Sequence, residues 1–546
     1  MSRRKRVSGE GLDLKRDSFV LITIMAYVIS LIYRIVLIYI IGEDGVAYFS
    51  IANETYIILS FVLSYAFSES VSALIRYRMK RGQYRNAERV LHVSQIIAII
   101  TGLVCTLLLL LLNRFFVEKI VNLPMSSLPV KMMAPAFVFV MLNGVYKGYF
   151  QGNGSKVPSI YSKVIETAVI FAGGCLGAYF SFRYGQKVSA LLQNPQYAPA
   201  YGAMGASIGF TVAGLLSLLY MMFLHLMYKR KYYRQLLQDN AKNLDSKSHI
   251  VRLLIRMGLP FAVYGVAFHC IPFLDACLFF KLSPDYVQKI TDWGNYYGKQ
   301  ITVCGILGGL VLVLCISPVK RIVQMAEHEE YRAVRDKIGL LIHQTAIFIV
   351  PTTIFTALFA EHFLDSVFKG SNMQTAKWIS WGSISMVLYV FAFLFISILM
   401  RLRKMRHILA CGAISLVIHV LITAILLLKS NMNIMALVLG NILFYGVLMV
   451  LCFWVLQRTF QYRQEWIHSI AFTIVSAAVA GIIVMLLDKV LAGAFGSLVS
   501  MLVCIPIGIV VYMILLVVTR SVTSHEAEEM IGGWIFQALA GLLHFL

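Results

Sequence analysis

The chain has 546 residues, of which 59% are hydrophobic and 14% are charged, and its formal net charge at pH 7 is +22. Ordinary soluble domains carry about 25% charged residues, so this composition excludes a water-soluble globular protein. Apolar runs of about 18 or more residues recur along the chain. Such runs are typical of helices that cross a hydrocarbon core about 30 Å thick. The sequence therefore predicts an all-α integral membrane protein.

About fourteen membrane-spanning helices are predicted, joined mostly by short connections. The predicted spans cover residues 18–41, 46–75, 88–112, 128–151, 157–181, 203–228, 252–280, 293–318, 336–360, 376–400, 405–428, 433–457, 466–488 and 496–519. Two connections are longer than the others, 182–202 and 229–251. The tail after Arg520 is predicted to form an amphipathic helix on the membrane surface.

The distribution of lysine and arginine predicts the orientation, because translocated loops contain few of them. Most of the 48 Lys and Arg residues lie in the two tails and in the loops that follow even-numbered spans. Both termini are therefore expected in the cytoplasm. Because the basic residues are spread over many short loops, attraction to anionic lipid headgroups explains the charge better than a nucleic-acid partner does.

A short sequence pattern occurs twice. Tyr84-Arg85 and Tyr331-Arg332 lie 247 residues apart, and each pair precedes a hydrophobic segment. At nearly the same offset, 115–118 resembles 362–365. An offset of six helices predicts a parallel repeat of two lobes, which places a substrate site at the interface between the lobes. Chance similarity between apolar segments is the alternative.

The repeat and the linkers together predict the domain organisation. The expected parts are a basic cytoplasmic tail (1–17), an N-lobe of six helices (18–228) and a cytoplasmic linker (229–251). They continue with a C-lobe of six helices (252–457), two additional helices (458–519) and a cytoplasmic amphipathic tail (520–546). The fold class is therefore two pseudo-symmetric six-helix lobes with two C-terminal helices.

Among the charged side chains inside the predicted spans, eight form two groups at different depths. A charge at the centre of a bilayer costs roughly 2.5–3.5 kcal/mol, so such charges usually face a water-filled cavity or a partner. One group, the outer tier, lies in the outer half of the first two spans of each lobe and comprises Arg34, Glu54, Asp275 and Lys299. The other group, the inner tier, lies near the cytoplasmic ends of spans 2, 4 and 5 and comprises Glu69, Lys147, Lys163 and Glu166.

Each tier also has a purely structural interpretation. The outer tier could form two ion pairs, Arg34 with Glu54 and Lys299 with Asp275. In the inner tier the lysines could extend to the cytoplasmic interface, and Glu69 could simply lie near a helix end. Lys163 and Glu166 are three residues apart and can pair on one helix face. Because the outer tier sums to zero charge, a bound anion must displace a carboxylate or meet a protonated one, which suggests ion coupling as a hypothesis.

The sequence contains no motif of an enzyme or a metal site. It has no P-loop, nucleophile elbow or H-E-x-x-H motif, and His269, His343 and His419 lie in separate spans. A membrane glycosyltransferase or acyltransferase would need acidic or histidine residues clustered at one membrane face. The prediction is therefore a transporter without catalytic residues, a metal or a cofactor.

Several sequence runs carry a family resemblance. They include Tyr33-Arg34 ahead of 41–45, the stretch 147–152, and Pro158 with Ser162 and 164–166. In the second lobe they are 259–260, 273–275 and 296–298. In these runs, and in its six plus six plus two arrangement, the chain resembles the multidrug/oligosaccharidyl-lipid/polysaccharide exporter superfamily. Within it the chain is similar to the branch of the stage V sporulation protein B family and the lipid II flippases.

The resemblance implies a flippase for an undecaprenyl-diphosphate-linked saccharide in the bacterial plasma membrane. It implies an inward V-shaped cavity in which cationic residues hold the diphosphate. Arg34 and Lys299 occupy the matching basic positions, and Lys147 and Lys163 are further candidates for substrate binding. The carboxylates, expected to act in coupling or ion pairing, are Glu54, Asp275, Glu166 and Glu69.

The partners expected from the resemblance are the lipid-linked glycan, membrane lipid and a coupling cation or proton, with the protein as a monomer. The alternative function is a cation- or proton-coupled multidrug exporter of the same superfamily. In that protein Glu54 and Asp275 would be the coupling sites.

Overall fold

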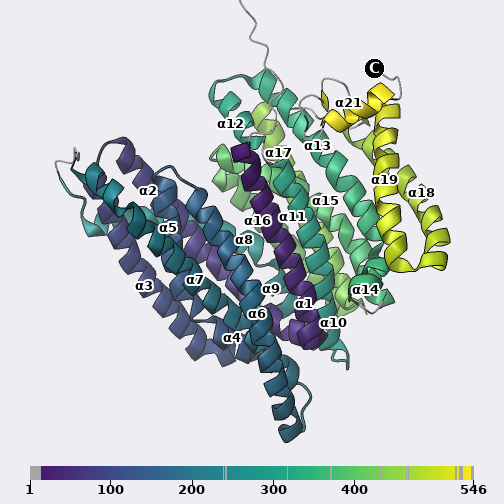
Figure 1. Ribbon diagram of the computed structural model, residues 1–546, viewed down its shortest axis with the longest axis horizontal. Coiled ribbons are helices and arrows are strands. Elements are labelled where there is room, and N and C mark those ends of the chain that lie inside the picture. The colour runs from purple at the N-terminus through teal and green to yellow at the C-terminus, as the bar shows by residue number, and fades with distance from the viewer. Residues whose placement is uncertain are drawn as a thin grey trace, which may run out of the picture. The chain divides into compact units, whose positions relative to one another are not determined.

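The computed structural model describes residues 14–237, 239, 243–316, 318–368, 372–430, 432–462, 464, 467–522, 526–527, 530 and 533–542. Throughout these residues the regular elements are helices (Figure 1), which confirms the predicted all-α fold. Most of the predicted basic tail, part of the predicted linker and part of the predicted C-terminal tail lie outside the described residues. Within that last tail, α21 (Gly533–Leu542) is helical.

Twelve helices of the described chain are long and apolar enough to cross a membrane, or thirteen if the bent pair Pro124–Met133 and Ala136–Gly152 forms one span. The chain is therefore a multi-pass membrane protein. The first of the twelve, Val20–Lys80, has 61 residues, which at 1.5 Å per residue is about three times the thickness of the hydrocarbon core. Gly42 interrupts it with φ 71° and ψ 176°, a conformation that glycine adopts readily. The break separates the first two predicted spans.

The first stretch comprises α1 (Leu14–Leu59), the π-helical segment η1 (Ser60–Tyr65) and α2 (Ala66–Lys80). The next elements are α3 (Tyr84–Arg114), η2 (Phe115–Val121), η3 (Pro124–Ser126), α4 (Ser127–Met133), α5 (Ala136–Gly152), α6 (Val157–Leu192), α7 (Tyr197–Leu236), α8 (Lys247–His269) and α9 (Ile271–Leu282). They are followed by α10 (Lys289–Asn295), the π-helical segment η4 (Tyr296–Ile301), α11 (Thr302–Cys315), α12 (Val319–Glu327), α13 (Tyr331–Leu358) and α14 (Ala360–Phe368). The chain continues with α15 (Met373–Arg401), α16 (Met405–Lys429), α17 (Ile434–Phe460), η5 (Ile467–Ala471), α18 (Phe472–Phe495) and α19 (Ser497–Val518).

The segment 182–202, expected as a connection, is instead mostly helical. The 36 residues of α6 give a length of about 54 Å, well beyond one membrane crossing. In Figure 1 the α6–α7 hairpin extends past the ends of its neighbours α3 and α4. The two helices stay together because glycines allow their backbones to touch: a Cβ on Gly205 would lie 2.0 Å from the Gly177 carbonyl oxygen. Polar composition suggested a loop, but this packing keeps the segment helical.

The internal repeat is matched in backbone conformation. Tyr84 and Tyr331 are each the first residue of a long helix, α3 and α13. Two residues before them, Gly82 (φ 67°) and Glu329 (φ 61°) are both left-handed. The residues on either side of these two also have similar dihedral angles in the two copies. A left-handed Glu is uncommon, so its recurrence at the same offset supports a real repeat against chance similarity.

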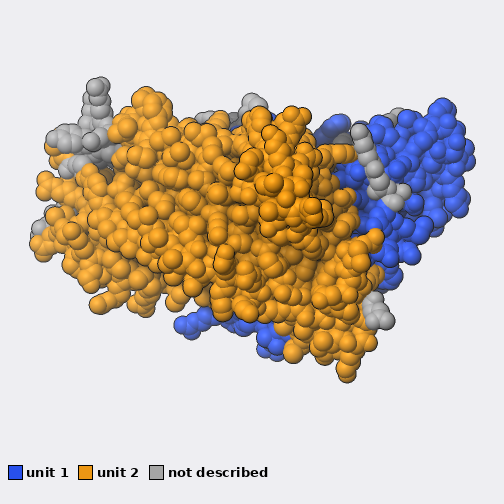
Figure 2. Space-filling model, turned by 90° about the horizontal axis from the view of Figure 1, so that it is seen from below, with its two compact units in different colours: residues 1–27, 299–419, 438–546 blue, residues 28–298, 420–437 orange. Residues whose placement is uncertain are grey.

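The chain divides into two compact units, coloured in Figure 2. Unit 1 comprises residues 1–27, 299–419 and 438–546, and unit 2 comprises residues 28–298 and 420–437. The predicted lobes were defined by the repeat and divide the chain elsewhere, since 252–298 falls into unit 2. They stay a prediction. The sites below are described within one unit each.

Candidate functional site

Three residues of the inner tier come together in unit 2, where two lysines contact the carboxylate of Glu166. We call Tyr56, Lys147, Lys163 and Glu166 the Glu166 cluster. Lys163 Nζ lies 2.9 Å from Glu166 Oε1 and Lys147 Nζ lies 3.5 Å from Glu166 Oε2. The Tyr56 hydroxyl donates a hydrogen bond to Glu166 Oε1 at 3.1 Å. Helices α1, α5 and α6 each contribute to the cluster, which holds two cations for one anion.

The two lysines differ in their access to solvent or lipid. The side chain of Lys163 is 60% exposed, whereas those of Lys147 and Glu166 are 18% and 9% exposed. The expected pairing of Lys163 with Glu166 along one face of α6 is present. Lys147 reaches the same carboxylate from α5, so simple extension to the interface does not describe it. The cluster therefore has a buried ion pair and one additional, accessible positive charge.

Replacing Glu166 with glutamine should destabilise the protein by about 3 kcal/mol, because Lys147 then stays buried without a counter-ion. The double variant E166Q/K147M should recover most of the loss, and Lys163→Met should have little effect because its side chain is largely exposed. The midpoint of thermal unfolding of the purified protein measures all three. Equal stability of E166Q and the wild type would contradict a structural role for this pair.

A second polar cluster, also in unit 2, surrounds the outer-tier carboxylate Glu54. We call Arg34, Asn53, Glu54 and Tyr297 the Glu54 cluster. The Tyr297 hydroxyl donates to Glu54 Oε1. Asn53 Nδ2 lies 3.2 Å from the same oxygen and 2.6 Å from the Tyr297 hydroxyl. The Arg34 guanidinium carbon lies 5.0 Å from the centre of the Tyr297 ring, within the range of a cation–π contact.

Close backbone packing brings Tyr297 to this position. A Cβ on Gly294 of α10 would lie 2.0 Å from the Glu43 carbonyl oxygen, and one on Gly298 would lie 2.9 Å from the Val46 side chain. Because these two glycines have no side chain, α10 and η4 can pack directly against α1. Tyr297 lies between the two glycines in the sequence and is fully buried. Its hydroxyl donates to the carboxylate of Glu54.

The other two outer-tier residues have different surroundings. Asp275 on α9 is 0% exposed, and its Oδ2 accepts a hydrogen bond from the Tyr296 hydroxyl at 3.4 Å. Lys299 belongs to unit 1, where its side chain is 4% exposed and its Nζ lies 5.6 Å from the centre of the Phe368 ring. Both charges are thus buried within the helical bundle, where partners have to compensate them.

Glu69 does not join either cluster. It lies in the first turn of α2 and is half-buried. Within the part of the chain that the structure describes, its carboxylate has no hydrogen bond and no ion pair within 4.0 Å. The charges that act on it from a distance are those of Lys156 and Arg76.

Sequence reasoning identified the charges but missed the uncharged donors around them. Tyr56, Asn53, Tyr296 and Tyr297 all donate to these carboxylates. A tyrosine beside a buried carboxylate is a natural partner, because its hydroxyl can donate while its ring packs in the apolar core. Yet tyrosine occurs 28 times in the chain, so its presence alone does not identify a site.

The chemistry available in these clusters is electrostatic. Ammonium and guanidinium groups donate charge-assisted hydrogen bonds to phosphate oxygens, and guanidinium does so in bidentate geometry. Among the described residues, no group of three or more His, Cys, Asp and Glu side chains could hold a metal ion. Cationic side chains can bind an anion through charge and hydrogen bonds alone, so its transport requires no covalent step.

Sequence comparisons link the chain to two proteins of Bacillus subtilis (strain 168), while no protein-family model matches it. Stage V sporulation protein B is 24% identical over 202 residues, which are 37% of this chain and 36% of that protein. The lipid II flippase MurJ is 22% identical over 166 residues, which are 29% of this chain and 30% of that protein. The chain thus matches about a third of the length of each relative.

Comparisons with solved structures show the fold over a larger part of the chain. An inward-facing multidrug resistance MATE family transporter of the MOP superfamily has a TM-score of 0.66 at 11% identity, covering 82% of this chain and 98% of that one. Lipid II flippase MurJ in an inward closed conformation has a TM-score of 0.65 at 11% identity, covering 92% and 98%. At these identities both likenesses show the fold.

Proposed function

We propose that this chain belongs to the multidrug/oligosaccharidyl-lipid/polysaccharide exporter superfamily, as its similarity to stage V sporulation protein B and MurJ and its fold support, and that it is a flippase for an undecaprenyl-diphosphate-linked saccharide. The cargo is lipid II or a polysaccharide repeat unit, which moves from the inner to the outer leaflet of a bacterial plasma membrane. The headgroup site opens first to the cytoplasm and then to the outside. No covalent step is needed.

The observation that carries the proposal is the excess positive charge of the Glu166 cluster, which the accessible Lys163 supplies beside the buried pair of Lys147 and Glu166. Two lysines share one carboxylate, so an incoming diphosphate meets a net positive charge. Lys163 is accessible, and it can turn to the diphosphate while Lys147 keeps Glu166 paired. Losing water costs a diphosphate much free energy, and charge-assisted hydrogen bonds from lysine offset that cost.

Arg34 and Lys299 complete the set of cations that we assign to diphosphate binding. Arg34 shares its surroundings with Glu54, which competes with an anion for the guanidinium. Tyr297 and Asn53 donate to that carboxylate, so Glu54 keeps hydrogen bonds when Arg34 turns to the substrate. A proton or cation that neutralises Glu54 would favour this exchange, which would couple transport to an ion gradient.

Depletion of the protein in its host tests the cargo. We expect undecaprenyl-linked intermediates to accumulate, and their glycan identifies the substrate. Lipid extracts analysed by mass spectrometry, before and after depletion, give the measurement. A host whose lipid-linked intermediates stay at their normal level during depletion would refute the proposal.

A second candidate is a cation- or proton-coupled exporter of soluble drugs. The fully buried Asp275 and the fold shared with a multidrug transporter favour it. The two functions predict that transport responds in opposite order to substitution of Asp275 and of Arg34. Drug export should be lost in Asp275→Asn and kept in Arg34→Ala, whereas flipping of a diphosphate lipid should depend more strongly on Arg34. Drug accumulation and lipid flipping are measured in the same two variants.

We also propose that both termini lie in the cytoplasm, on the basis of the lysine and arginine distribution. This places the turn at Asn194, between α6 and α7, outside the cell and the turn at Glu329, before α13, inside it. Alkaline phosphatase, which is active only outside the cytoplasm, should be active when fused after Asn194 and inactive when fused after Glu329. The reverse pattern would invert the orientation.

A further inference from the structure

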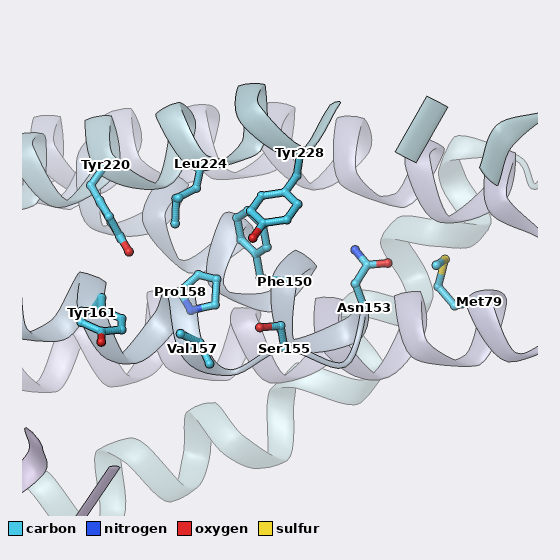
Figure 3. A pocket seen from close by; sticks show the side chains of 10 residues that line it. All are labelled: Met79, Phe150, Asn153, Ser155, Val157, Pro158, Tyr161, Tyr220, Leu224 and Tyr228. Carbon is cyan, nitrogen blue, oxygen red and sulfur yellow. The ribbon is translucent and has the colours of Figure 1, made fainter. Parts of the chain in front are cut away.

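A cavity of about 390 Å³ lies inside unit 2, and none of the residues that line it belongs to either polar cluster. Figure 3 shows Tyr220, Leu224 and Tyr228 of α7 on one side and Ser155, Val157 and Pro158 on the facing side. The residues of α7 are four apart and so lie on one helix face. The volume is within the range of ligand sites, about 300–1,000 Å³. This cavity can therefore hold a group of the size of a lipid headgroup.

The lining of the cavity is amphipathic. Phe150 and Leu224 are apolar, whereas three tyrosines, Asn153 and Ser155 bring polar atoms. Among the described residues, the hydroxyls of Tyr161, Tyr220 and Ser155 have no hydrogen-bond partner. Polar groups that line a cavity without a protein partner are available to a ligand.

The place of the cavity in the fold is the membrane–water interface. It is lined in part by the turn 153–156, which connects the membrane helices α5 and α6. A turn between two spans must lie at a membrane surface, on whichever side that is. Tyrosine is enriched at this depth because its ring is apolar and its hydroxyl is polar. Tyr161 and Tyr228 are also half-exposed, 48% and 46%, so a lipid can approach.

The charge next to the cavity is positive. Lys156 lies between the lining residues Ser155 and Val157 and is exposed, and its ammonium has no ion pair within 4.0 Å among the described residues. Arg76 Nη2 donates to the Gln151 carbonyl oxygen at 3.2 Å, two residues before Asn153. Glu69 supplies one compensating negative charge. Basic pockets between membrane helices are typical sites for anionic lipid headgroups.

We propose that this cavity binds the headgroup of an anionic glycerophospholipid of the surrounding membrane. The phosphodiester accepts hydrogen bonds from the Tyr220 and Ser155 hydroxyls and is attracted by Lys156, while the acyl chains stay outside. The bound lipid holds the ends of α5, α6 and α7 together. This site is separate from the cations assigned to diphosphate transport and does not depend on that function.

The test measures lipid binding to the full-length purified protein after removal of bound lipid. Phosphatidylglycerol and phosphatidylcholine with identical acyl chains are added, and bound lipid is counted by native mass spectrometry. We expect phosphatidylglycerol to bind at least about tenfold more tightly. Leu224→Trp should abolish the difference by filling the cavity. Tyr220→Phe should weaken binding about fivefold through the loss of one hydrogen bond.

Matched variants make the result decisive. Leu219→Trp changes a half-exposed leucine of α7 outside the cavity, so it should bind phosphatidylglycerol like the wild type. Arg34→Ala should also bind it normally, which separates this site from the transport proposal. Equal binding of the two lipids would overturn the inference, as would full phosphatidylglycerol binding by a folded L224W protein. If undecaprenyl diphosphate displaced phosphatidylglycerol from this cavity at a tenth of its concentration, the assignment to membrane phospholipid would be wrong.

Discussion

Arg34→Ala should reduce the rate of flipping of an undecaprenyl-diphosphate-linked saccharide by about tenfold to a hundredfold. The guanidinium makes hydrogen bonds to a charged group, and each of these contributes roughly 1.5–3 kcal/mol. Arg34→Lys should recover part of the loss, because lysine keeps the charge but not the bidentate geometry. Lys299→Met should cause a loss of similar size, since it removes the charge and keeps most of the buried stem. The assay follows a fluorescent lipid-linked saccharide in proteoliposomes.

A suitable control for these variants is Lys187→Ala. Lys187 is an exposed residue of α6, in the part of the helix that extends beyond one membrane crossing, and its loss should leave flipping unchanged. All variants need equal amounts of folded protein in the vesicles. Normal flipping by both Arg34→Ala and Lys299→Met would show that these cations do not bind the diphosphate, and the site would have to be sought in the Glu166 cluster.

Gly205→Ala should destabilise the protein by about 3 kcal/mol or more. The added Cβ would lie 2.0 Å from the carbonyl oxygen of Gly177, and a backbone atom in a packed helix cannot move aside cheaply. Helices α6 and α7 would have to separate along their lengths, which loses the close contact that small residues permit in membranes. The midpoint of thermal unfolding of the detergent-solubilised protein gives the measurement.

Gly173→Ala, on the neighbouring helix α6, should not destabilise the protein. A Cβ there would meet its nearest atom, the Gly209 Cα, at 3.8 Å, an ordinary contact. Because alanine favours a helix over glycine by up to about 1 kcal/mol, this variant should be unchanged or slightly more stable. If the two alanine variants unfolded at the same temperature, close glycine packing would not hold this hairpin together.

Features that depend on local composition were predictable from the chain alone. Apolar runs identify membrane helices because a backbone inside the bilayer must satisfy its own hydrogen bonds, which leaves little choice but a helix. The repeat was recognised from the Tyr-Arg pairs, and the matching left-handed Gly82 and Glu329 agree with it. The charges were found because each is expensive in an apolar span. The pairing of Lys163 with Glu166 follows from helix periodicity.

The tertiary structure decided which side chains meet. Lys147 reaches Glu166 from another helix, and Tyr297 reaches Glu54 because Gly294 and Gly298 let η4 pack closely on α1. Neither contact has a sequence signal, since uncharged donors and glycines are common in every span and act only through their neighbours. The helical form of 182–192 was missed for the same reason. Its polar composition is that of a loop, and only the contact of α6 with α7 makes the helix the more stable choice.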